Sequence, residues 1–264
     1  MAGNSSDKPV ALVTGASAGI GDAIARRLAR GGYRIVAVAR REERLTQLAK
    51  ALASTTAVET LAADVAVRDT PQRAVALAMK AFGRLDCLVN NAGSFKFGAV
   101  DQTDDAALDE AVEISLKAPF RFCREALRVM GSGSSIINIG SVWGILAGMS
   151  GGSYCAVKAG LIGLTQSIAA DYGPKGIRAN LVAPGVVRTD MTDGFWETDG
   201  FKRTNHEMTP LNRECTLDDV ANAVHFLASH EGSFISGQTI ALDGGWSTTK
   251  FLSLEALTAR RVPA

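Results

Sequence analysis

Short apolar runs alternate along the chain with longer segments in which apolar residues recur every three or four positions. Val10–Val13 is the first such run, and the segment after it places Ile20, Ile24 and Leu28 one helical turn apart. The first pattern is typical of a buried strand and the second of an amphipathic helix. The ordered part of the chain therefore begins with a strand, a tight turn and a helix.

The same alternation continues to the end of the chain and predicts its remaining elements. Strands are expected at 33–39, 58–63, 85–89, 135–139, 177–182 and 239–242, and helices at 42–52, 71–82, 104–130 in two segments, 154–172 with Ser153 as its cap, and 217–228. Strands that alternate with helices favour one parallel sheet with helices on both faces. The prediction is an α/β protein with a doubly wound parallel sheet of about seven strands.

Length and composition agree with one large α/β domain. The chain has 264 residues, of which 47% are hydrophobic, so it can bury a sizeable core. We assign residues 9–246 to this domain, 1–8 to a flexible N-terminal tail and 247–264 to a C-terminal tail. Residues 186–212 form a long irregular segment that carries apolar side chains, which favours a lid over a linker.

Charge and residue usage narrow the classes of partner. A net charge of +1 offers no electrostatic argument for nucleic acid or a membrane surface. No secretory signal is recognised at the N-terminus, and the most apolar region is too short to cross a bilayer. The cysteines and histidines are too scattered for a metal site, and they are Cys87, Cys123, Cys155, Cys215, His206, His225 and His230. We expect a cytoplasmic protein without a metal.

The turn after the first strand has the spacing Gly-x-x-x-Gly-x-Gly. Unpaired N–H groups at the start of the next helix attract anions, and glycine lets a phosphate approach the backbone. The residues expected to hold a nucleotide here are Gly15, Ser17, Ala18, Gly19, Ile20 and Gly21. The Lys and Ser/Thr of a P-loop are missing, which disfavours a nucleoside triphosphatase, and a plain strand-to-helix turn remains the alternative.

Polar residues follow other strands at the same predicted edge of the sheet. Arg40 and Arg41 stand where dinucleotide folds place an acid for NAD or an arginine for the 2′-phosphate of NADP, and Ala39 replaces the acid. This favours NADP, unless the arginines only begin the next helix. Asp64 could accept a hydrogen bond from an adenine amino group or cap the helix that follows. Asn90–Gly93 suits either a turn or a ligand contact.

Tyr154 and Lys158 lie four residues apart in a predicted helix and therefore share a face. A nearby ammonium stabilises a phenolate and lowers its pKa, so the pair could act as a general acid/base. Ser141, at the end of the preceding strand, could hydrogen-bond a substrate carbonyl. An exposed helix face is the alternative interpretation of the pair.

Taken in this order and spacing, the motifs resemble the short-chain dehydrogenase/reductase family, in particular its 3-oxoacyl reductases. The similarity extends from Val10 to Gly245. The matching pieces are Thr14-Gly15-Ala16-Ser17-Ala18-Gly19-Ile20-Gly21, Asp64-Val65, Asn90-Asn91-Ala92-Gly93, Ser141, Tyr154-Cys155-Ala156-Val157-Lys158, Pro184-Gly185 with Thr189, and Asp243-Gly244-Gly245. The resemblance implies a single Rossmann-type fold and an NAD(P)-dependent oxidoreductase acting on carbonyls or secondary alcohols.

The resemblance also implies a role for individual residues. Ser141 would orient the reacting oxygen, Tyr154 would pass the proton, and Lys158 would bind the nicotinamide ribose. Val187 and Thr189 would contact the nicotinamide carboxamide. The other coenzyme contacts implied are Val65, Asn91, Ala92, Gly93, Pro184 and Gly185.

Two positions depart from the family pattern. Ser115 replaces an asparagine that normally holds a water in the proton relay, and a serine hydroxyl could still hold one. Ala18 stands where many NADP-dependent members have a basic residue. We expect an active enzyme that favours NADP(H), with NAD(H) also possible.

The substrate is expected to be a largely apolar carbonyl compound or alcohol. The residues expected around it are Phe95, Phe97, Val142, Trp143, Leu146, Met149, Phe195 and Trp196. Few polar side chains lie among them, which fits a hydrophobic ketone or a 3-oxoacyl thioester better than a sugar. Alternatively, several of them pack on a neighbouring subunit, because the family usually forms homotetramers or homodimers.

Two other functions fit parts of the sequence. A nucleotide-binding sensor or scaffold without turnover would use the same fold. A serine hydrolase would use Ser150, which lies in a Gly-x-Ser-x-Gly match with Asp190 and His206 downstream. That elbow needs a strand directly before the serine, and the predicted strand ends far earlier.

Overall fold

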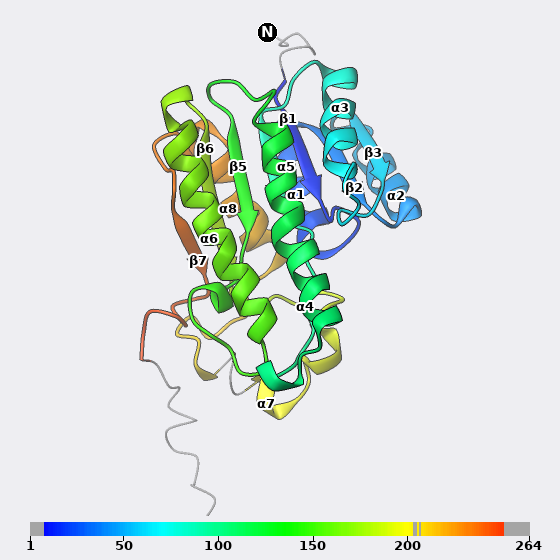
Figure 1. The fold of residues 1–264 in the computed structure, drawn as a ribbon. Helices are drawn as coiled ribbons and strands as arrows, with labels where there is room; N and C mark the ends of the chain where they lie inside the picture. The colour runs from blue at the N-terminus through cyan, green and yellow to red at the C-terminus, as the bar shows by residue number, and fades with distance from the viewer. Residues whose placement is uncertain (1–7, 203–204, 206, 251–264) are drawn as a thin grey trace, which may run out of the picture.

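A single parallel sheet with helices on both faces forms the protein (Figure 1). The computed structural model describes residues 8–202, 205 and 207–250, and within these the seven strands run in the order β3-β2-β1-β4-β5-β6-β7. The strands are β1 Val10–Thr14, β2 Arg34–Ala39, β3 Val58–Ala62, β4 Cys87–Asn90, β5 Ser135–Ile139, β6 Arg178–Pro184 and β7 Thr239–Leu242. The predicted doubly wound sheet is confirmed.

The helices divide between the two faces of the sheet. They are α1 Gly19–Arg30, α2 Glu42–Leu52, α3 Thr70–Phe82, α4 Asp105–Val112, α5 Ala118–Ala126, α6 Gly152–Tyr172, α7 Asp199–Lys202 and α8 Leu217–Ala228. One core packs α1, α2 and α8 on the sheet, and the other packs α3, α5 and α6 on its opposite face. Figure 1 shows α5 and α6 in front of the sheet and α8 behind it.

Parallel pairing brings the carboxyl ends of the strands to one edge. Thr14 pairs with Val38 across β1 and β2, and Asn90 pairs with Asn138 across β4 and β5. Strands buried on both faces become almost wholly apolar, as β1 is. A polar residue that follows such a strand therefore lies at this edge, where open α/β sheets bind ligands.

Several predicted elements match the structure at their bounds. The predicted cap at Ser153 is wrong, and of the two roles considered for Asp64 the helix cap is excluded. The helices at 42–52 and 217–228 and the strands at 135–139 and 239–242 are confirmed. Ser153 does not cap α6, because the helix already begins at Gly152 with Gly151 as its N-cap. Asp64 does not cap α3, because its Oδ1 accepts from the N–H of Ala66 at 2.9 Å and so closes a local turn.

Within the predicted helical region 104–130, an unusual turn joins two helices. Glu113–Lys117 forms a π-helical turn (η3) between α4 and α5. Such turns carry one extra residue per turn and are frequent at functional sites. Ser115 lies inside this one and is almost fully buried, with 1% exposure.

The irregular segment 186–212 lies against the carboxyl edge of the sheet. Its described part includes the short turn Asp193–Phe195 (η6) and α7. Its end is attached to the turn after β7, where Leu211 N–H donates to the carbonyl of Gly244.

No helix in the described part of the chain has the length and apolarity needed to cross a membrane. The predicted tails fall largely on residues 1–7 and 251–264, outside the described residues.

Candidate active site

The glycine turn after β1 forms an open cradle at the N-terminus of α1. Gly15 and Gly19 have positive φ angles of 68° and 55°, which glycine adopts most readily. A Cβ on Gly21 would lie 2.2 Å from the carbonyl oxygen of Gly15, so only glycine fits there. The N-cap of α1 is Ala18, whose methyl group cannot accept a hydrogen bond. The first N–H groups of α1 are therefore available to a phosphate, which fits a dinucleotide.

Thr14 and Asn91 join the ends of β1 and β4 beside this cradle. Thr14 Oγ1 accepts from the backbone N–H groups of Asn91 and Ala92, at 3.0 and 3.1 Å. Asn91 Nδ2 donates back to the carbonyl of Thr14 at 3.0 Å. These bonds hold Ala92 and Gly93 next to the glycine turn. No separate role was predicted for Thr14, although it is the one polar residue of the apolar strand β1.

Two arginines follow β2, and each meets a carboxylate. Arg40 NH1 lies 3.9 Å from Asp64 Oδ2, at the end of β3. Arg41 Nε donates to Ser17 Oγ at 3.3 Å, and its NH1 lies 3.4 Å from Asp190 Oδ2. Both guanidinium groups are well exposed, so a ligand can reach them. Val65, after Asp64, is buried in the second core.

Ser141, Tyr154 and Lys158 converge at the end of β5. Lys158 Nζ donates to the carbonyl of Ile139 at 2.8 Å and lies 5.5 Å from the centre of the Tyr154 ring. Ser141 Oγ accepts from the N–H of Trp143 at 3.1 Å, and the Ser141 hydroxyl also interacts with Tyr154. The face of α6 that carries Tyr154 and Lys158 is therefore turned toward the edge of the sheet and not toward the solvent.

Burial is the largest influence on the pKa values of Tyr154 and Lys158. It raises the pKa of the Tyr154 phenol, and the hydrogen bond with Ser141 only partly opposes the rise. The predicted lowering of the Tyr154 pKa is not found, because burial outweighs the other influences, and Lys158 Nζ donates to the carbonyl of Ile139. Burial also lowers the pKa of Lys158 from its ordinary 10.5 to about 8. The phenol is thus protonated at neutral pH.

The buried ammonium of Lys158 should lower the free energy of unfolding at neutral pH. With its pKa at about 8 when folded and 10.5 when unfolded, the unfolded chain binds the extra proton between these values, so stability rises with pH through this window. We expect Lys158→Met to raise the free energy of unfolding by about 1 to 2 kcal/mol at pH 7, after allowance for the lost hydrogen bond. Denaturant unfolding at pH 7 and pH 10 measures the gain, which should shrink at the higher pH.

Lys80→Met is the matched control for that experiment, because Lys80 is exposed on α3. Its effect on unfolding should be small and the same at both pH values. A destabilised Lys158→Met at pH 7 would contradict a desolvated ammonium.

Ser115 lies close to Lys158 across Gly93. Its Oγ accepts from the N–H of Ser94 at 3.3 Å. A Cβ on Gly93 would lie 3.6 Å from Lys158 Nζ and 3.7 Å from Ser115 Oγ, so the two polar groups border the same small space. The π-helical turn carries the serine hydroxyl to this point.

The segment 186–212, predicted to be a lid, begins across the glycine turn from β1. A Cβ on Gly19 would lie 3.3 Å from Thr189 Cγ2, which places Thr189 at the mouth of the cradle. Gly185 N–H donates to the carbonyl of Leu242, and Val187 is buried in the first core. The Pro184–Thr189 stretch is thereby held between β7 and α1.

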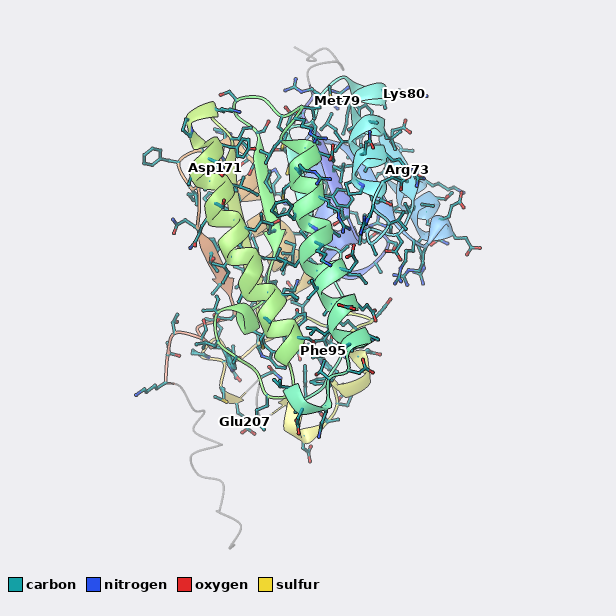
Figure 2. All side chains as sticks on the ribbon, viewed as in Figure 1. Arg73, Met79, Lys80, Phe95, Asp171 and Glu207 are labelled. Carbon is teal, nitrogen blue, oxygen red and sulfur yellow. The ribbon has the colours of Figure 1, made fainter. Side chains whose placement is uncertain are left out.

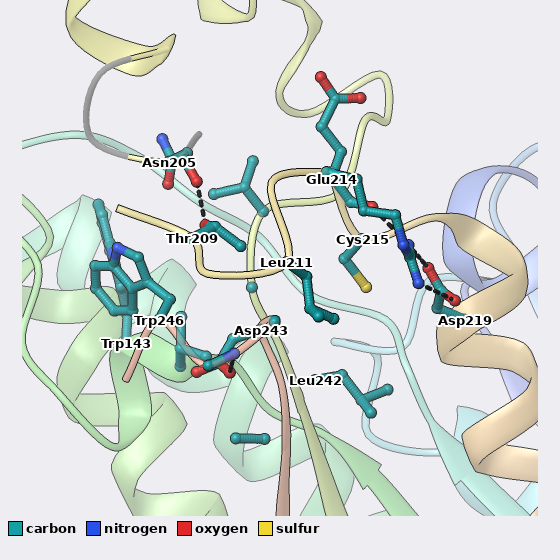
Figure 3. Close-up of a pocket in the computed structure, with 17 residues that line it drawn as sticks. Trp143, Asn205, Thr209, Leu211, Glu214, Cys215, Asp219, Leu242, Asp243 and Trp246 are labelled. Atoms are coloured by element: carbon teal, nitrogen blue, oxygen red, sulfur yellow. Dashed lines mark hydrogen bonds and ion pairs between the residues drawn. The ribbon is translucent and has the colours of Figure 1, made fainter. Parts of the chain in front are cut away.

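A cavity of about 510 Å³ lies between the segment 186–212 and the end of β7, and Figure 3 shows the residues that line it. Of the predicted substrate residues, Val142 and Trp143 line it. Its other apolar lining includes Val186, Leu211, Ala241, Leu242 and Trp246, none of which was predicted as a substrate residue. Their signal was weak, because they lie in the irregular segment 186–212, in the last strand or directly after it.

The other predicted substrate residues have different surroundings. Phe95 forms an edge-to-face cluster with Phe97, Trp143 and Tyr154, with ring centres 4.5, 5.7 and 4.9 Å away. Figure 2 shows Phe95 at the lid end of the molecule, opposite Met79 and Lys80. The remaining predicted residues are Met149 at 91% exposure, Leu146 at 43%, Trp196, which is buried against Phe201, and Phe195, whose side chain lies outside the described residues.

Ser150 lacks the setting of a hydrolase nucleophile. β5 ends at Ile139, and turns occupy the described chain between that strand and Ser150. Asp190, one proposed partner, pairs with Arg41, and His206 lies outside the described residues. Within the described residues, no cluster of His, Cys, Asp or Glu is arranged to bind a metal.

The strand order and the glycine turn define a Rossmann-type dinucleotide-binding fold. Residues 15–247 match the family model described as enoyl-(acyl carrier protein) reductase. The chain is 39% identical over 236 residues to 3-oxoacyl-(acyl-carrier-protein) reductase FabG of Rickettsia felis, covering 89% of this chain and 95% of that protein.

A second curated relative and a solved structure show the same similarity. The A-factor type gamma-butyrolactone 1′-reductase of Streptomyces virginiae is 35% identical over 247 residues, covering 90% of this chain and 95% of that protein. The crystal structure of a short chain dehydrogenase from Burkholderia cenocepacia in complex with NADP has a TM-score of 0.87 and 34% identity, covering 93% of this chain and 100% of that one. The chain belongs to the short-chain dehydrogenase/reductase family, and it is an NAD(P)-dependent oxidoreductase.

Proposed function

We propose that the protein is an NADP(H)-preferring enzyme that interconverts a carbonyl group and a secondary alcohol on a largely apolar substrate. The observation that carries this proposal is the convergence of Ser141, Tyr154 and Lys158 beside the glycine cradle. A proton-transfer group and a nucleotide site then share one edge of the sheet, as hydride transfer to a carbonyl requires.

The nicotinamide coenzyme supplies the hydride when it is bound. Its diphosphate fits the open N-terminus of α1, and its adenosine end fits the ends of β2 and β3. The residues proposed to hold it are Gly15, Ser17, Ala18, Gly19, Ile20, Gly21, Arg40, Arg41, Asp64, Val65, Asn91, Ala92, Gly93, Pro184, Gly185, Val187 and Thr189.

Each polar group near β5 has a task in the proposed mechanism. The Ser141 hydroxyl donates to the substrate oxygen and orients it. Tyr154 donates its phenol proton to that oxygen as the carbonyl is reduced, and its raised pKa keeps the proton available at neutral pH. Lys158 binds the nicotinamide ribose. Ser115 holds a water beside Lys158, which returns a proton to the relay.

The coenzyme preference rests on the arginines after β2. Arg40 and Arg41 expose two guanidinium groups where the ribose of the adenosine would lie, and a guanidinium fork matches phosphate geometry. The Burkholderia relative was crystallised with NADP. Ala18 contributes no charge, so the two arginines carry the preference.

We expect Arg41→Ala to raise the dissociation constant of NADPH about 10-fold to 100-fold and to change that of NADH little, because a charge-assisted hydrogen bond to phosphate contributes about 1.5 to 3 kcal/mol. Titration of both coenzymes by calorimetry measures this, with NADPH oxidation across a panel of apolar ketones as the turnover assay. Arg44→Ala, on the exposed side of α2, is the control. Equal effects on the two coenzymes would contradict a 2′-phosphate contact.

The substrate proposed is a ketone or 3-oxoacyl compound with an apolar body. Trp143, Trp246 and Leu211 line the cavity beside the catalytic group, and apolar walls with few polar groups favour such substrates. We also propose a homodimer or homotetramer. Leu108 on α4 and Phe120 on α5 expose large apolar side chains beside α6, a surface that a second copy would cover.

A further inference from the structure

Arg41 links three segments that surround the proposed coenzyme site. Its Nε donates to Ser17 in the glycine turn, and its NH1 lies 3.4 Å from the carboxylate of Asp190 in the lid. Arg41 itself follows β2, and 149 positions separate it from Asp190. The lid is thus connected by this ion pair to the end of the sheet that reads the adenosine ribose.

The two arginines differ in what holds their carboxylate partners. Asp64, which lies near Arg40, is fixed by the N–H of Ala66 in a local turn at the end of β3. Asp190, which pairs with Arg41, belongs to the lid and is 79% exposed. A 2′-phosphate that arrives between the arginines meets a carboxylate held in a local turn on one side and a highly exposed carboxylate on the other.

The exchange of partners at Arg41 depends on the coenzyme. A phosphate monoester carries a charge of about −1.5 to −2 at pH 7 and offers three acceptor oxygens, so it binds a guanidinium more strongly than one exposed carboxylate does. An exposed ion pair contributes only about 0.2 to 1 kcal/mol. NADP therefore displaces Asp190 from Arg41 at a small cost, whereas NAD lacks the phosphate and leaves the pair in place.

We propose that Asp190 is a specificity-determining residue that competes with the 2′-phosphate of the coenzyme for Arg41, and so connects the lid to the presence of that phosphate. The proposal rests on the proposed function, since it requires a dinucleotide at this edge. It goes further in giving a lid residue, remote in sequence from the arginines, a part in the choice between the two coenzymes. Asp190 weakens NADP binding and leaves NAD binding unchanged.

The test is the affinity of Asp190→Asn for NADPH and NADH, measured by isothermal titration calorimetry. Asparagine keeps the size of the side chain and removes its charge. We expect the dissociation constant of NADPH to fall about threefold to fivefold, which is the upper part of the range for an exposed ion pair, and that of NADH to stay the same. The ratio of the NADPH and NADH dissociation constants decides whether Asp190 competes with the 2′-phosphate.

Two further variants separate competition at Arg41 from a general change in charge. Asp193→Asn removes the same charge three residues away, where the carboxylate pairs with Arg188 at 3.1 Å and not with Arg41. It should leave the ratio unchanged. In an Arg41→Ala background, Asp190→Asn should lose its effect on the ratio, because the group for which Asp190 competes is gone.

Each other outcome overturns a stated part of the account. An unchanged ratio in Asp190→Asn, or an effect that persists without Arg41, refutes the competition while leaving the proposed function intact. An equal effect in Asp193→Asn assigns the change to net charge and also refutes it. Failure of the unmodified protein to bind either coenzyme refutes the proposed function itself.

Discussion

Replacing Tyr154 with phenylalanine is expected to lower kcat/KM for carbonyl reduction by about 10² to 10⁴, the range for loss of a positioned general acid. The substitution removes only the phenol oxygen, and the ring keeps its edge-to-face contacts with Phe95 and Trp143. The coenzyme site is otherwise unchanged, so the dissociation constant of NADPH should change less than about threefold. Steady-state kinetics on a verified ketone, with calorimetry for the coenzyme, measure both quantities.

Tyr172→Phe is the matched control for this experiment. Tyr172 ends the same helix at the opposite side of the molecule, where its ring contacts Lys175. That variant should keep full activity. If Tyr154→Phe retained the activity of the unmodified protein, the phenol would not be the proton donor.

Replacing Gly21 with alanine is expected to abolish measurable coenzyme binding, with a rise of at least roughly 100-fold in the dissociation constant of NADPH. The added Cβ would lie 2.2 Å from the carbonyl oxygen of Gly15 and 2.5 Å from Nδ2 of Asn91. Both neighbours are held in place, so the turn and the first turn of α1 must move apart. Overpacking of this kind also costs about 1 to 3 kcal/mol of stability. Calorimetry and denaturant unfolding measure the two effects.

Gly163→Ala in α6 is the control, since a Cβ there meets nothing within 4 Å. It should leave coenzyme binding unchanged and stabilise the fold by about 0.4 to 1 kcal/mol, as alanine does in a helix. Tight NADPH binding by a folded Gly21→Ala variant would show that the phosphates do not approach this turn.

The alternation of apolar runs was sufficient to predict the sheet, because its five inner strands are buried on both faces, whereas the edge strands β3 and β7 are only partly buried. β1 and β5 consist almost wholly of buried positions, and each is followed by a glycine. The polar residues after the strands then fall at one edge by topology alone. This is why Gly15, Asn91 and Ser141 could be grouped before the structure was known.

Burial and long-range pairing could not be predicted in the same way. Helical spacing places Tyr154 and Lys158 on one face, but it does not reveal that desolvation outweighs their attraction. The pairing of Arg41 with Asp190 depends on the path of the lid, which has no periodic pattern. The packing of Trp196 on Phe201 depends on the path of the same segment and could not be predicted either.

The predicted cap at Ser153 was wrong because α6 begins one residue earlier, at Gly152. The cap considered for Asp64 is excluded for a different, local reason. Ser and Asp accept hydrogen bonds from backbone N–H groups in turns as readily as at helix ends. Asp64 accepts from Ala66 in a turn, several residues before α3 begins at Thr70. The sequence identifies such residues as N–H acceptors without identifying which turn they close.

The most direct test of the central claim follows the hydride itself. The protein is incubated with an apolar ketone panel and NADPH that carries deuterium at nicotinamide C4, in each stereochemical form, and the products are analysed by mass spectrometry. The account predicts an alcohol with one deuterium on the carbinol carbon from one of the two labelled forms. Alcohol formed without deuterium from either form, or no alcohol from any ketone while NADPH is bound, would contradict it.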